Sequence, residues 1–467
     1  MDGYPQLAAD HLLHTEMVGA LSETVGNVIR QLNLEFARSE ISPEEPQEIQ
    51  KTKIRARQRA YELLVEVALN IIGTEANRVG FSSEETELTF GEIMNALKTW
   101  ENNEVSTMGL LKTTVANAVS ERFIEDAKKV AKGESLVSSM ASEIESSLDR
   151  SSPASSLVMA SRRSIEGNVY FRMAKLGLCK FGNDYAIGLR WLRHLGFVQV
   201  STNPVLAARA YEDDSNLWGE FAKTIKLHPE WHDQPEQFAD EIAMEATMTA
   251  LWPNLAIFRP IALLSKLHDG LVSYQLNPGV ADSVELSLKD AIRIYSSASR
   301  FLAEYDSYLL WGYSRVPERA RPNIVFKIAA QSPAATQITT ALNEMGIGTN
   351  NTVTYTVGQE AELIIAAMKG MAKARKMGIS MTQTYETNMG GRLESHLREI
   401  EAERILRQTL KSSSNKEAIL TTLAERLHAL KEFEKFHGID DRIRILCSFQ
   451  FLKSLINPSF VEAVTPQ

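Results

Sequence analysis

The spacing of apolar residues divides the chain into a helical first third and a second part that mixes β-like runs with helices. Between residues 51 and 72, apolar side chains recur every three or four positions, and residues 90–97 and 108–123 repeat this pattern. Such spacing is typical of amphipathic helices. A serine-rich segment at residues 151–156 indicates a mobile connection. We therefore predict an all-helical N-terminal domain over residues 1–165, in which no residue pattern indicates a catalytic or binding site.

From about residue 170, short β-like runs are mostly followed by helical stretches. The runs are residues 176–180, 197–201, 271–276, 324–329, 352–356, 379–385 and 442–449, with a weaker one at 460–465. Strands that alternate with helices build parallel sheets, and seven or eight such units favour a closed barrel over an open sheet. The sequence therefore predicts an α/β fold in which a (β/α)8 TIM barrel over residues 170–467 follows the N-terminal helices.

Lys327 stands inside an otherwise apolar run, residues 324–329. Burying an ammonium group costs several kcal/mol unless the group is paired or neutralised. An edge strand or a snorkelling side chain would explain such a lysine without any function. The strand–helix–strand pattern around it, which continues to residues 349–355, instead indicates a lysine inside a parallel sheet.

Polar residues gather where the predicted strands end. In a barrel, functional side chains lie at the carboxyl ends of strands, and residues i and i+2 share one side. The polar pairs at these ends are Asn350 and Thr352, Ser273 and Gln275, Ser201 and Asn203, and Gln383 and Tyr385, with Asp184 after the first run. A buried hydrogen-bond network or a set of helix caps would use the same residues.

One lysine among neutral polar groups and a single carboxylate is also suited to imine chemistry. A lysine that attacks a ketone must be unprotonated, and a dry barrel mouth disfavours the charged form. A carboxylate such as Asp184 would then move protons as a carbinolamine loses water. His228 and His232 flank Pro229 without a zinc-protease pattern, so we expect a helix start there and no metal site.

Composition narrows the class of protein. The 467 residues are 44% hydrophobic and 23% charged, which is ordinary for a globular protein with two or three domains. A net charge of −9 without a basic stripe argues against nucleic-acid binding. Two cysteines, Cys179 and Cys447, suit a reducing compartment. Because neither a secretory signal nor a long apolar span is visible, we expect a soluble cytoplasmic protein with no membrane partner.

Two stretches resemble the transaldolase family. Residues 199–206, Gln-Val-Ser-Thr-Asn-Pro-Val-Leu, resemble its Thr-Thr-Asn-Pro-Ser signature, and residues 324–329 with 346–352 resemble its Schiff-base strand and the next strand. The likeness covers roughly residues 175–467. It implies an enzyme of carbohydrate metabolism, as in the pentose phosphate pathway, that needs no cofactor. Such an enzyme forms a Schiff base with a ketose and transfers a dihydroxyacetone unit to an aldose or aldose phosphate.

Carried over position by position, the resemblance implies roles for individual residues. Lys327 would form the Schiff base, and Asp184 would act as the acid and base. Thr352 would help to hold a catalytic water, which Gln275 would orient without activating it. The remaining implied contacts are to the substrate, through Asn203, Asn350, Ser448, Arg392 and Tyr385.

Three departures from the family pattern leave alternatives open. Gln275 stands where transaldolases have a glutamate; fructose-6-phosphate aldolases have glutamine there, and Tyr385 matches their tyrosine on strand six. Gln450 stands where the family usually has a second cation for a phosphate. The sequence ends at the predicted eighth strand. An aldolase-like lyase therefore remains an alternative, as does a non-catalytic barrel that serves as a binding or scaffold protein. Homo-oligomers are possible.

Overall fold

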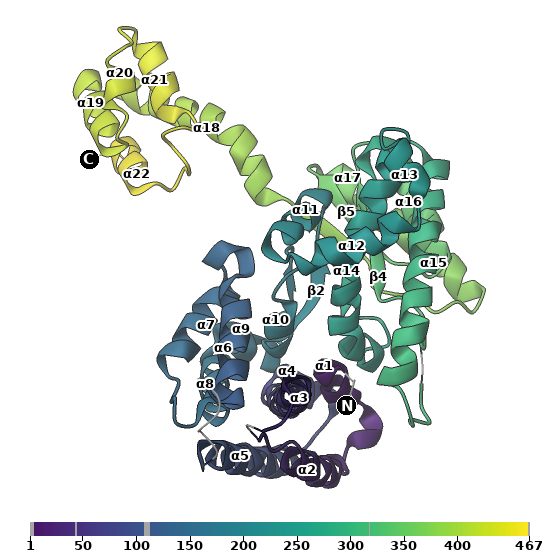
Figure 1. Cartoon of the computed structure of the whole chain (residues 1–467). Helices are drawn as coiled ribbons and strands as arrows, with labels where there is room; N and C mark the ends of the chain where they lie inside the picture. The colour runs from purple at the N-terminus through teal and green to yellow at the C-terminus, as the bar shows by residue number, and fades with distance from the viewer. Residues whose placement is uncertain (1–3, 43, 107–112, 317, 466–467) are drawn as a thin grey trace. The chain divides into compact units, whose positions relative to one another are not determined.

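The computed structural model describes residues 4–42, 44–106, 113–316 and 318–465, which Figure 1 shows as a ribbon. The chain forms two compact units. The first runs to Asn351 and includes Glu362–Glu386, and the second comprises Thr352–Ala361 with the residues from Thr387 onward. Each unit is described by itself.

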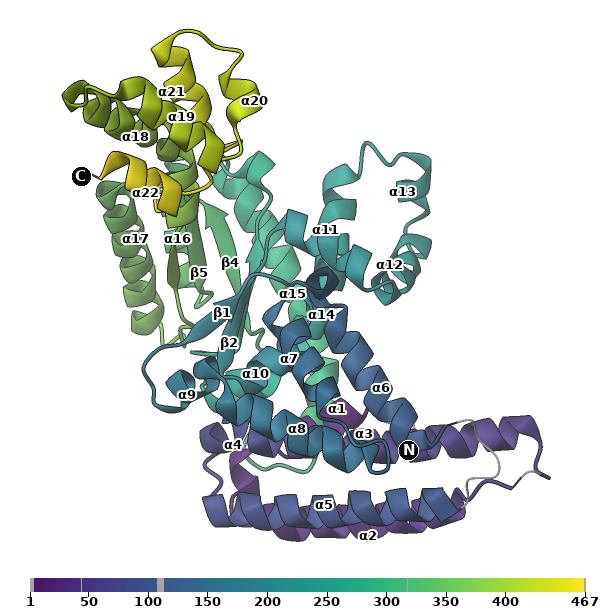
Figure 2. The ribbon, with the colours of Figure 1, turned by 90° about the vertical axis from the view of Figure 1, so that its left-hand side faces the viewer.

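Helices make up the N-terminal part of the first unit, as the apolar spacing predicts. They are α1 (Pro5–His11), α2 (Leu21–Arg38), α3 (Gln47–Ile72), α4 (Thr74–Val79), α5 (Ser83–Ser106), α6 (Val115–Lys128), α7 (Leu136–Ser146), α8 (Pro153–Gly167) and α9 (Val169–Lys175). Figures 1 and 2 show α2 and α5 side by side. The predicted helices at 51–72 and 90–97 are confirmed within α3 and α5. Of the predicted helix at 108–123, residues 108–112 lie outside the described residues, and α6 contains the rest from Val115.

The prediction of a mobile connection at residues 151–156 is wrong. Pro153 occupies the first turn of α8, where its missing N–H is not needed, and Ser155 is buried. The carboxylate of Glu101, on α5, accepts hydrogen bonds from the backbone N–H groups of Ala154 and Ser155 at 2.6 and 3.0 Å, and from the Ser155 hydroxyl at 2.6 Å. A buried carboxylate therefore caps α8 and fixes Ser155, one of the serines that look like a linker in sequence.

A six-stranded sheet follows in the order of the sequence. Its strands are β1 (Phe181–Asn183), β2 (Phe197–Ser201), β3 (Leu271–Gln275), β4 (Ile324–Ala329), β5 (Thr349–Thr354) and β6 (Tyr385–Asn388). The first four pair in parallel. The helices between the strands are α10 (Leu189–His194), α11 (Pro204–Asp213), α12 (Asn216–Lys226), α13 (Pro229–Asp233), α14 (Ala239–Leu264), α15 (Val284–Leu309), α16 (Ala334–Glu344) and α17 (Val357–Lys376). This curled parallel sheet with its helices is consistent with part of a TIM barrel.

The predicted strands at 197–201, 271–276 and 324–329 are confirmed, whereas the others are displaced or wrong. The predicted run at 176–180 directly precedes β1, the run at 352–356 overlaps β5 at residues 352–354, and the run at 379–385 meets β6 only at Tyr385. The runs at 442–449 and 460–465 fall in helices, α21 (Ile439–Cys447) and α22 (Pro458–Val464). The prediction of eight strands is therefore not confirmed.

The physical reason lies in the period of the apolar residues at the C-terminal end. The buried side chains of α21 are Ile443, Leu446 and Cys447, which are three and four positions apart, as on one face of a helix. Pro458 opens α22, and the Asn457 side chain accepts hydrogen bonds from the backbone N–H groups of Ser459 and Phe460. Both features mark the start of a helix. A short apolar run alone does not distinguish a helix from a strand. Three further helices, α18 (Gly390–Ser412), α19 (Lys416–Arg426) and α20 (Leu430–Phe433), complete the second unit.

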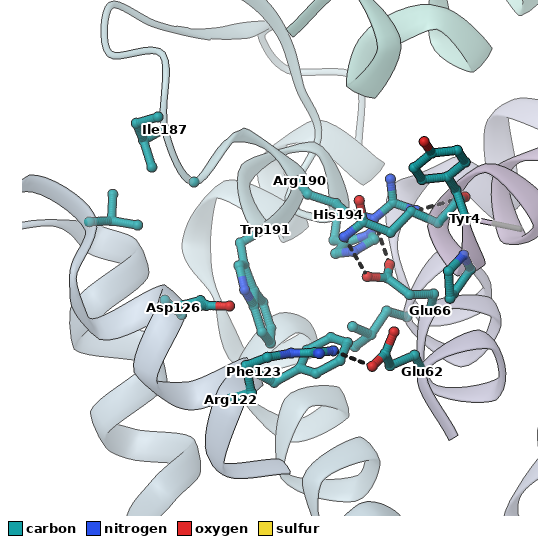
Figure 3. Close-up of a pocket in the computed structure, with 16 residues that line it drawn as sticks. Tyr4, Glu62, Glu66, Arg122, Phe123, Asp126, Ile187, Arg190, Trp191 and His194 are labelled. Atoms are coloured by element: carbon teal, nitrogen blue, oxygen red, sulfur yellow. Dashed lines mark hydrogen bonds and ion pairs between the residues drawn. The ribbon is translucent and has the colours of Figure 1, made fainter. Parts of the chain in front are cut away.

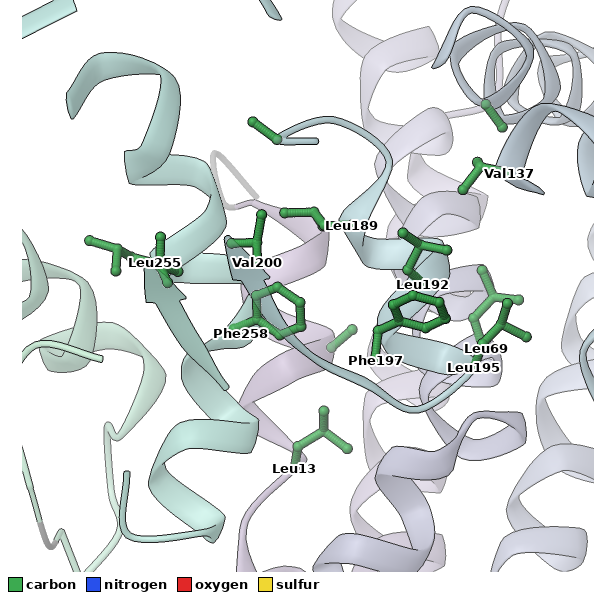
Figure 4. Packing of buried hydrophobic residues seen from close by; sticks show 14 of the residues in the cluster. Leu13, Leu69, Val137, Leu189, Leu192, Leu195, Phe197, Val200, Leu255 and Phe258 are labelled. Atoms are coloured by element: carbon green, nitrogen blue, oxygen red, sulfur yellow. The ribbon is translucent and has the colours of Figure 1, made fainter. Parts of the chain in front are cut away.

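One hydrophobic core joins the N-terminal helices to the sheet within the first unit. Figure 4 shows Leu69 and Val137 from the helices in the same cluster as Phe197 and Val200 of β2 and Phe258 of α14. The cluster continues from Ala9 to Leu363. The predicted domain boundary near residue 165 stays a prediction.

A buried ion network fastens α10, the first helix after β1, to the N-terminal helices. The Arg193 guanidinium donates to both carboxylate oxygens of Asp10 at 3.0 and 2.8 Å and to Glu75 at 2.8 Å. Arg190 donates to the same Asp10 carboxylate at 3.0 and 2.9 Å. Burial alone would raise the pKa of Asp10, but the two arginines outweigh it and hold the pKa below its ordinary value. Asp10 is therefore a buried anion fixed between two cations.

A second buried pair fixes the segment that leads into β4. Arg259, on α14, donates to the Asp306 carboxylate on α15 at 2.8 and 2.6 Å, and both side chains are fully buried. The same guanidinium donates to the carbonyl of Arg321 at 2.8 Å, and the Asp306 carboxylate accepts from the backbone N–H of Ala320 at 2.7 Å. Because residues 320 and 321 lie just before β4, this pair positions the strand that carries Lys327.

We expect Arg193→Met to lower the free energy of unfolding by about 3–5 kcal/mol, because Asp10 and Glu75 stay buried with fewer partners. Urea denaturation of the full chain measures the change. Lys128→Ala is the matched control, since Lys128 and Glu145 form an exposed pair at 2.7 Å, and its loss should cost under about 1 kcal/mol. Equal effects of the two substitutions would contradict a structural role for the Arg193 network.

The protonation of Glu104 makes the free energy of unfolding depend on pH. Burial raises the pKa of this carboxyl from 4.5 to about 7, although it accepts a hydrogen bond from the Ala116 N–H at 3.2 Å and lies 3.8 Å from Arg57. Between about pH 4.5 and about pH 7, Glu104 is therefore protonated in the folded state and ionised in the unfolded state. The stabilisation is complete below about pH 4.5 and is lost as the pH rises through about 7. Glu104→Gln should remove about 3 kcal/mol of this pH dependence in urea denaturation. The exposed Glu145→Gln control should retain it; an unchanged slope in Glu104→Gln would refute the assignment.

Candidate functional site

Lys327 lies on an inner strand of the sheet. β4 pairs with β3 on one side and neighbours β5 on the other, so the edge-strand alternative is wrong. The five other residues of β4 are buried, and the exposed fraction of Lys327 is 9%. The amine is therefore held within the fold rather than extended into solvent, which is the first requirement of the proposed chemistry.

Hydroxyl and amide groups from three neighbouring strands surround this lysine. The Lys327 Nζ donates to the Ser201 Oγ at 3.3 Å, across from β4 to β2. The Asn350 side chain on β5 donates to the same Ser201 Oγ at 3.0 Å and to the Ser273 Oγ on β3 at 3.1 Å. Ser201 and Ser273 are direct register partners. Four consecutive strands thus contribute to one polar cluster, which we call the Lys327 cluster: Lys327, Ser201, Ser273 and Asn350.

Gln275 is adjacent to this cluster. It ends β3 and is paired in register with Lys327 across the β3–β4 ladder. A neutral amide therefore stands beside the lysine where a glutamate would add a negative charge. Such a neighbour can orient a water or a hydroxyl group but cannot accept a proton at neutral pH.

Asp184 and Asn203 follow the carboxyl ends of the first two strands. Asp184 is exposed and comes directly after β1. It is not the cap of the next helix, because α10 begins at Leu189 after Gly188. Asn203 does cap a helix: its side-chain oxygen accepts from the Leu206 N–H of α11 at 3.0 Å. The cap uses only the side-chain oxygen of Asn203 and does not involve its amide nitrogen.

Tyr385 lies nearer the amino ends of the strands than the Lys327 cluster does. It begins β6 and packs against Ala262, Leu267, Leu271 and Val325. Leu271 opens β3, and Val325 lies two residues before Lys327. Burial, helped by the charge of Asp269, raises the pKa of Tyr385 above its ordinary value, so the phenol stays protonated. The structure does not bring Tyr385 into the Lys327 cluster.

Three of the predicted residues belong to the second unit. Thr352, on β5, is buried and its hydroxyl contacts the Met389 sulfur at 3.7 Å. Arg392 is exposed in the first turn of α18. Ser448 follows the helix α21, and its hydroxyl donates to the Ile445 carbonyl at 2.7 Å. The strand on which the role of Ser448 depends is therefore a helix, and the phosphate contacts of Arg392 and Ser448 stay predictions.

Ser201 and Ser273 are the residues that sequence reasoning did not assign to the site. Both appear among the polar pairs at strand ends, but the family resemblance gives neither a role. Their position two residues before Asn203 and Gln275, on the same side of each strand, is the signal that identifies them.

A separate cavity of about 420 Å³ lies between α3, α6 and α10 (Figure 3). Four of its charged residues form two pairs, Glu66 with Arg190 at 2.5 Å and Glu62 with Arg122. None of the predicted site residues lines it. Within the described part of the chain, no group of three or more His, Cys, Asp or Glu side chains is placed to hold a metal ion.

A family model described as transaldolase/fructose-6-phosphate aldolase matches residues 181–430, more than half of the 467 residues. The match begins at β1, contains the whole Lys327 cluster and ends before Ser448. No curated protein matches the sequence. In the described residues, no helix is both long and apolar enough to cross a membrane. The resemblance drawn from the sequence is confirmed: the chain belongs to the transaldolase/fructose-6-phosphate aldolase family.

Proposed function

We propose that this protein is a transaldolase-type enzyme in which Lys327 forms a Schiff base with a ketose and transfers a dihydroxyacetone unit to an aldose or aldose phosphate. The observation that carries the proposal is the burial of Lys327 within hydrogen-bonding distance of Ser201, beside Asn350. Family membership supports an aldolase-type reaction. A lysine that forms an imine must reach the carbonyl carbon of a substrate while neighbouring polar groups bind the hydroxyls of that substrate.

The amine attacks the ketone carbon, and loss of water from the carbinolamine gives a protonated imine. The imine then accepts the electron pair of the bond between the third and fourth carbons as that bond breaks. The hydroxyl on the fourth carbon gives its proton to a base, a role that suits Asp184, and an aldehyde leaves. The enamine that remains attacks an acceptor aldehyde, the new alkoxide takes the proton back, and water releases the ketose.

The neutral polar groups would select the bound fragment. Asn350 is buried and already directs its amide nitrogen toward hydroxyl oxygens, those of Ser201 and Ser273. A sugar hydroxyl can replace a serine hydroxyl as the acceptor at little cost, because one hydrogen bond is exchanged for another. The Asn203 amide nitrogen would serve a second hydroxyl, since the helix cap occupies only its oxygen. Neutral groups of this kind suit the uncharged, hydroxylated dihydroxyacetone fragment of a ketose.

An aldolase-like lyase is the second candidate, and the pairing of Gln275 with Lys327 favours it. Glutamine cannot activate a water by accepting its proton, so release of the donor to solution rather than orderly transfer becomes the simpler outcome. Helices α21 and α22 lie where the last two strands were predicted. This difference favours a third candidate, a barrel that binds a ligand but does not catalyse a reaction. The two experiments below separate these candidates.

Borohydride reduction in the presence of fructose 6-phosphate should attach a three-carbon or six-carbon adduct to Lys327. Peptide mapping by mass spectrometry locates the adduct. Lys327→Met should abolish it, whereas the exposed Lys223→Met should leave it unchanged. The same mixture with and without erythrose 4-phosphate distinguishes transfer, cleavage and no reaction. No trapped ketose or dihydroxyacetone in the wild-type protein would refute the proposal.

Ser201→Ala should lower the rate of trapping about five- to tenfold, because the Lys327 amine loses the partner that orients it, a contribution of about 1 kcal/mol. Ser273→Ala is the matched control, since the Ser273 hydroxyl accepts a hydrogen bond from Asn350, and it should change the rate by less than about twofold. The single-turnover rate of borohydride-trapped adduct formation is the measurement. A larger effect of Ser273→Ala than of Ser201→Ala would contradict the arrangement.

A further inference from the structure

The two sequence neighbours of Asp184 are held by hydrogen bonds. Asp184 opens the loop of residues 184–188, which joins β1 to α10. The Asn183 side-chain N–H donates to the Tyr185 carbonyl at 2.9 Å, and the Tyr185 hydroxyl donates to the Asp213 carboxylate at 2.5 Å. Burial, together with this hydrogen bond, raises the pKa of Tyr185, so the phenol stays protonated and remains the donor. Because Asp213 ends α11, the loop is tied to the helix that follows β2.

The N-terminal helices bind the same end of α11. In the short turn Val130–Gly133, which follows α6, the Ala131 N–H donates to the Asp213 carboxylate at 3.0 Å. Beside it, Lys132 and Glu212 form an exposed ion pair at 2.9 Å. One carboxylate oxygen of Asp213, Oδ2, therefore accepts hydrogen bonds from both this turn and the β1–α10 loop.

The turn keeps a backbone conformation that residues with a Cβ atom disfavour. The φ angles of Ala131 and Lys132 are 53° and 54°, in the left-handed region. Non-glycine residues hold such angles only where surrounding contacts impose them, and such residues gather near functional sites. Here the contacts with the end of α11 fall on the same two residues. The conformation of the turn is therefore coupled to its contact with α11.

The turn also packs against the far end of the loop. A Cβ added at Gly188 would lie 3.0 Å from the Val130 Cγ1 and 3.4 Å from the Val137 Cγ2, and the φ angle of Gly188 is 79°. Both valines are buried. Because a side chain larger than hydrogen would be strained there, the loop can approach the N-terminal helices closely. The loop is therefore held by a hydrogen bond at Tyr185, directly after Asp184, and by close packing at Gly188.

We propose that Tyr185 and Asp213 are positioning residues for Asp184, and that the turn Val130–Gly133 of the N-terminal helices supports them. This inference rests on the proposed function, in which Asp184 takes the proton of the hydroxyl on the fourth carbon. In the described part of the chain, no hydrogen bond holds the Asp184 carboxylate itself, so its position depends on the loop backbone. A base must come within about 3.2 Å of its proton donor, and a displacement of about 1 Å lowers the rate strongly.

Tyr185→Phe tests the proposal, with turnover of fructose 6-phosphate in the presence of erythrose 4-phosphate as the measurement. We expect kcat to fall about tenfold and KM to change by less than about twofold, because the groups that bind the substrate lie on other elements. The matched control is Tyr211→Phe, since Tyr211 on α11 also donates one hydrogen bond, to the Ala246 carbonyl at 2.6 Å. It should leave kcat unchanged. Equal losses of kcat in the two variants would overturn the proposal.

A double-mutant cycle shows whether Tyr185 acts through Asp184. The single-turnover rate of fructose 6-phosphate cleavage should fall in Asp184→Asn, and adding Tyr185→Phe should lower it further by less than about twofold. A loss of about tenfold in both backgrounds would refute a positioning role. Borohydride trapping with dihydroxyacetone separates this result from the proposed function. A wild-type chain that gives no adduct refutes the proposed function, whereas a wild-type adduct with an unchanged kcat in Tyr185→Phe refutes the positioning role alone.

Asp213 gives a second test that includes the N-terminal turn. Asp213→Ala should lower kcat by about tenfold or more, because the loop and the turn lose their shared acceptor. Asp213→Asn keeps an oxygen that can accept both hydrogen bonds and should recover most of this loss. The control is Glu212→Ala, which removes only the exposed pair with Lys132 and should change kcat by less than about twofold. Thermal melting verifies the fold of each variant, and a Glu212→Ala variant as slow as Asp213→Ala would contradict the proposal.

Discussion

The sheet has to accommodate one buried amine, that of Lys327, on an inner strand. Lys327 cannot be placed among the apolar residues of β4 without compensation, and its Nζ donates to the Ser201 hydroxyl, which also accepts from the Asn350 amide. Those contacts require β2, β3, β4 and β5 to keep their register. The catalytic proposal therefore rests on the same geometry that makes the lysine tolerable inside the fold.

Two buried arginines outside the Lys327 cluster hold the elements next to its strands. Arg259 fixes the approach to β4 by binding Asp306 and the carbonyl of Arg321. Arg193 fastens α10 to Asp10 and Glu75 and so joins the N-terminal helices to the first βα unit of the sheet. Buried ion pairs of this kind contribute little net stability compared with apolar packing, but losing one partner is costly. Within the first unit, they act as positional constraints on the elements that carry the site.

The sequence predicts the centre of the fold well and its C-terminal end poorly, for a physical reason. Residues 197–201, 271–275 and 324–329 are strands that turn signals and helical stretches separate clearly. The residues of α21 and α22 are short apolar runs that suit either period, and their helix signals, Pro458 and Asn457, are local. The serines at 151–156 look like a linker because their cap, Glu101, lies about fifty residues earlier. The Arg193 network was not predictable, because Glu75 and Asp10 lie more than one hundred residues from Arg193 in the sequence.

Lys327 and Asn350 could be predicted from the sequence, because period-two alternation places polar residues of consecutive strands on one side of the sheet. The role of Ser448 depended on a seventh strand, and Ser448 follows a helix instead. A crystal structure of the protein after reaction with dihydroxyacetone and borohydride tests the central claim most directly. We expect continuous density from the Lys327 Nζ to a three-carbon unit, with a hydroxyl in hydrogen-bond contact with Asn350. An unmodified Lys327, or a fragment attached to any other lysine, would contradict it.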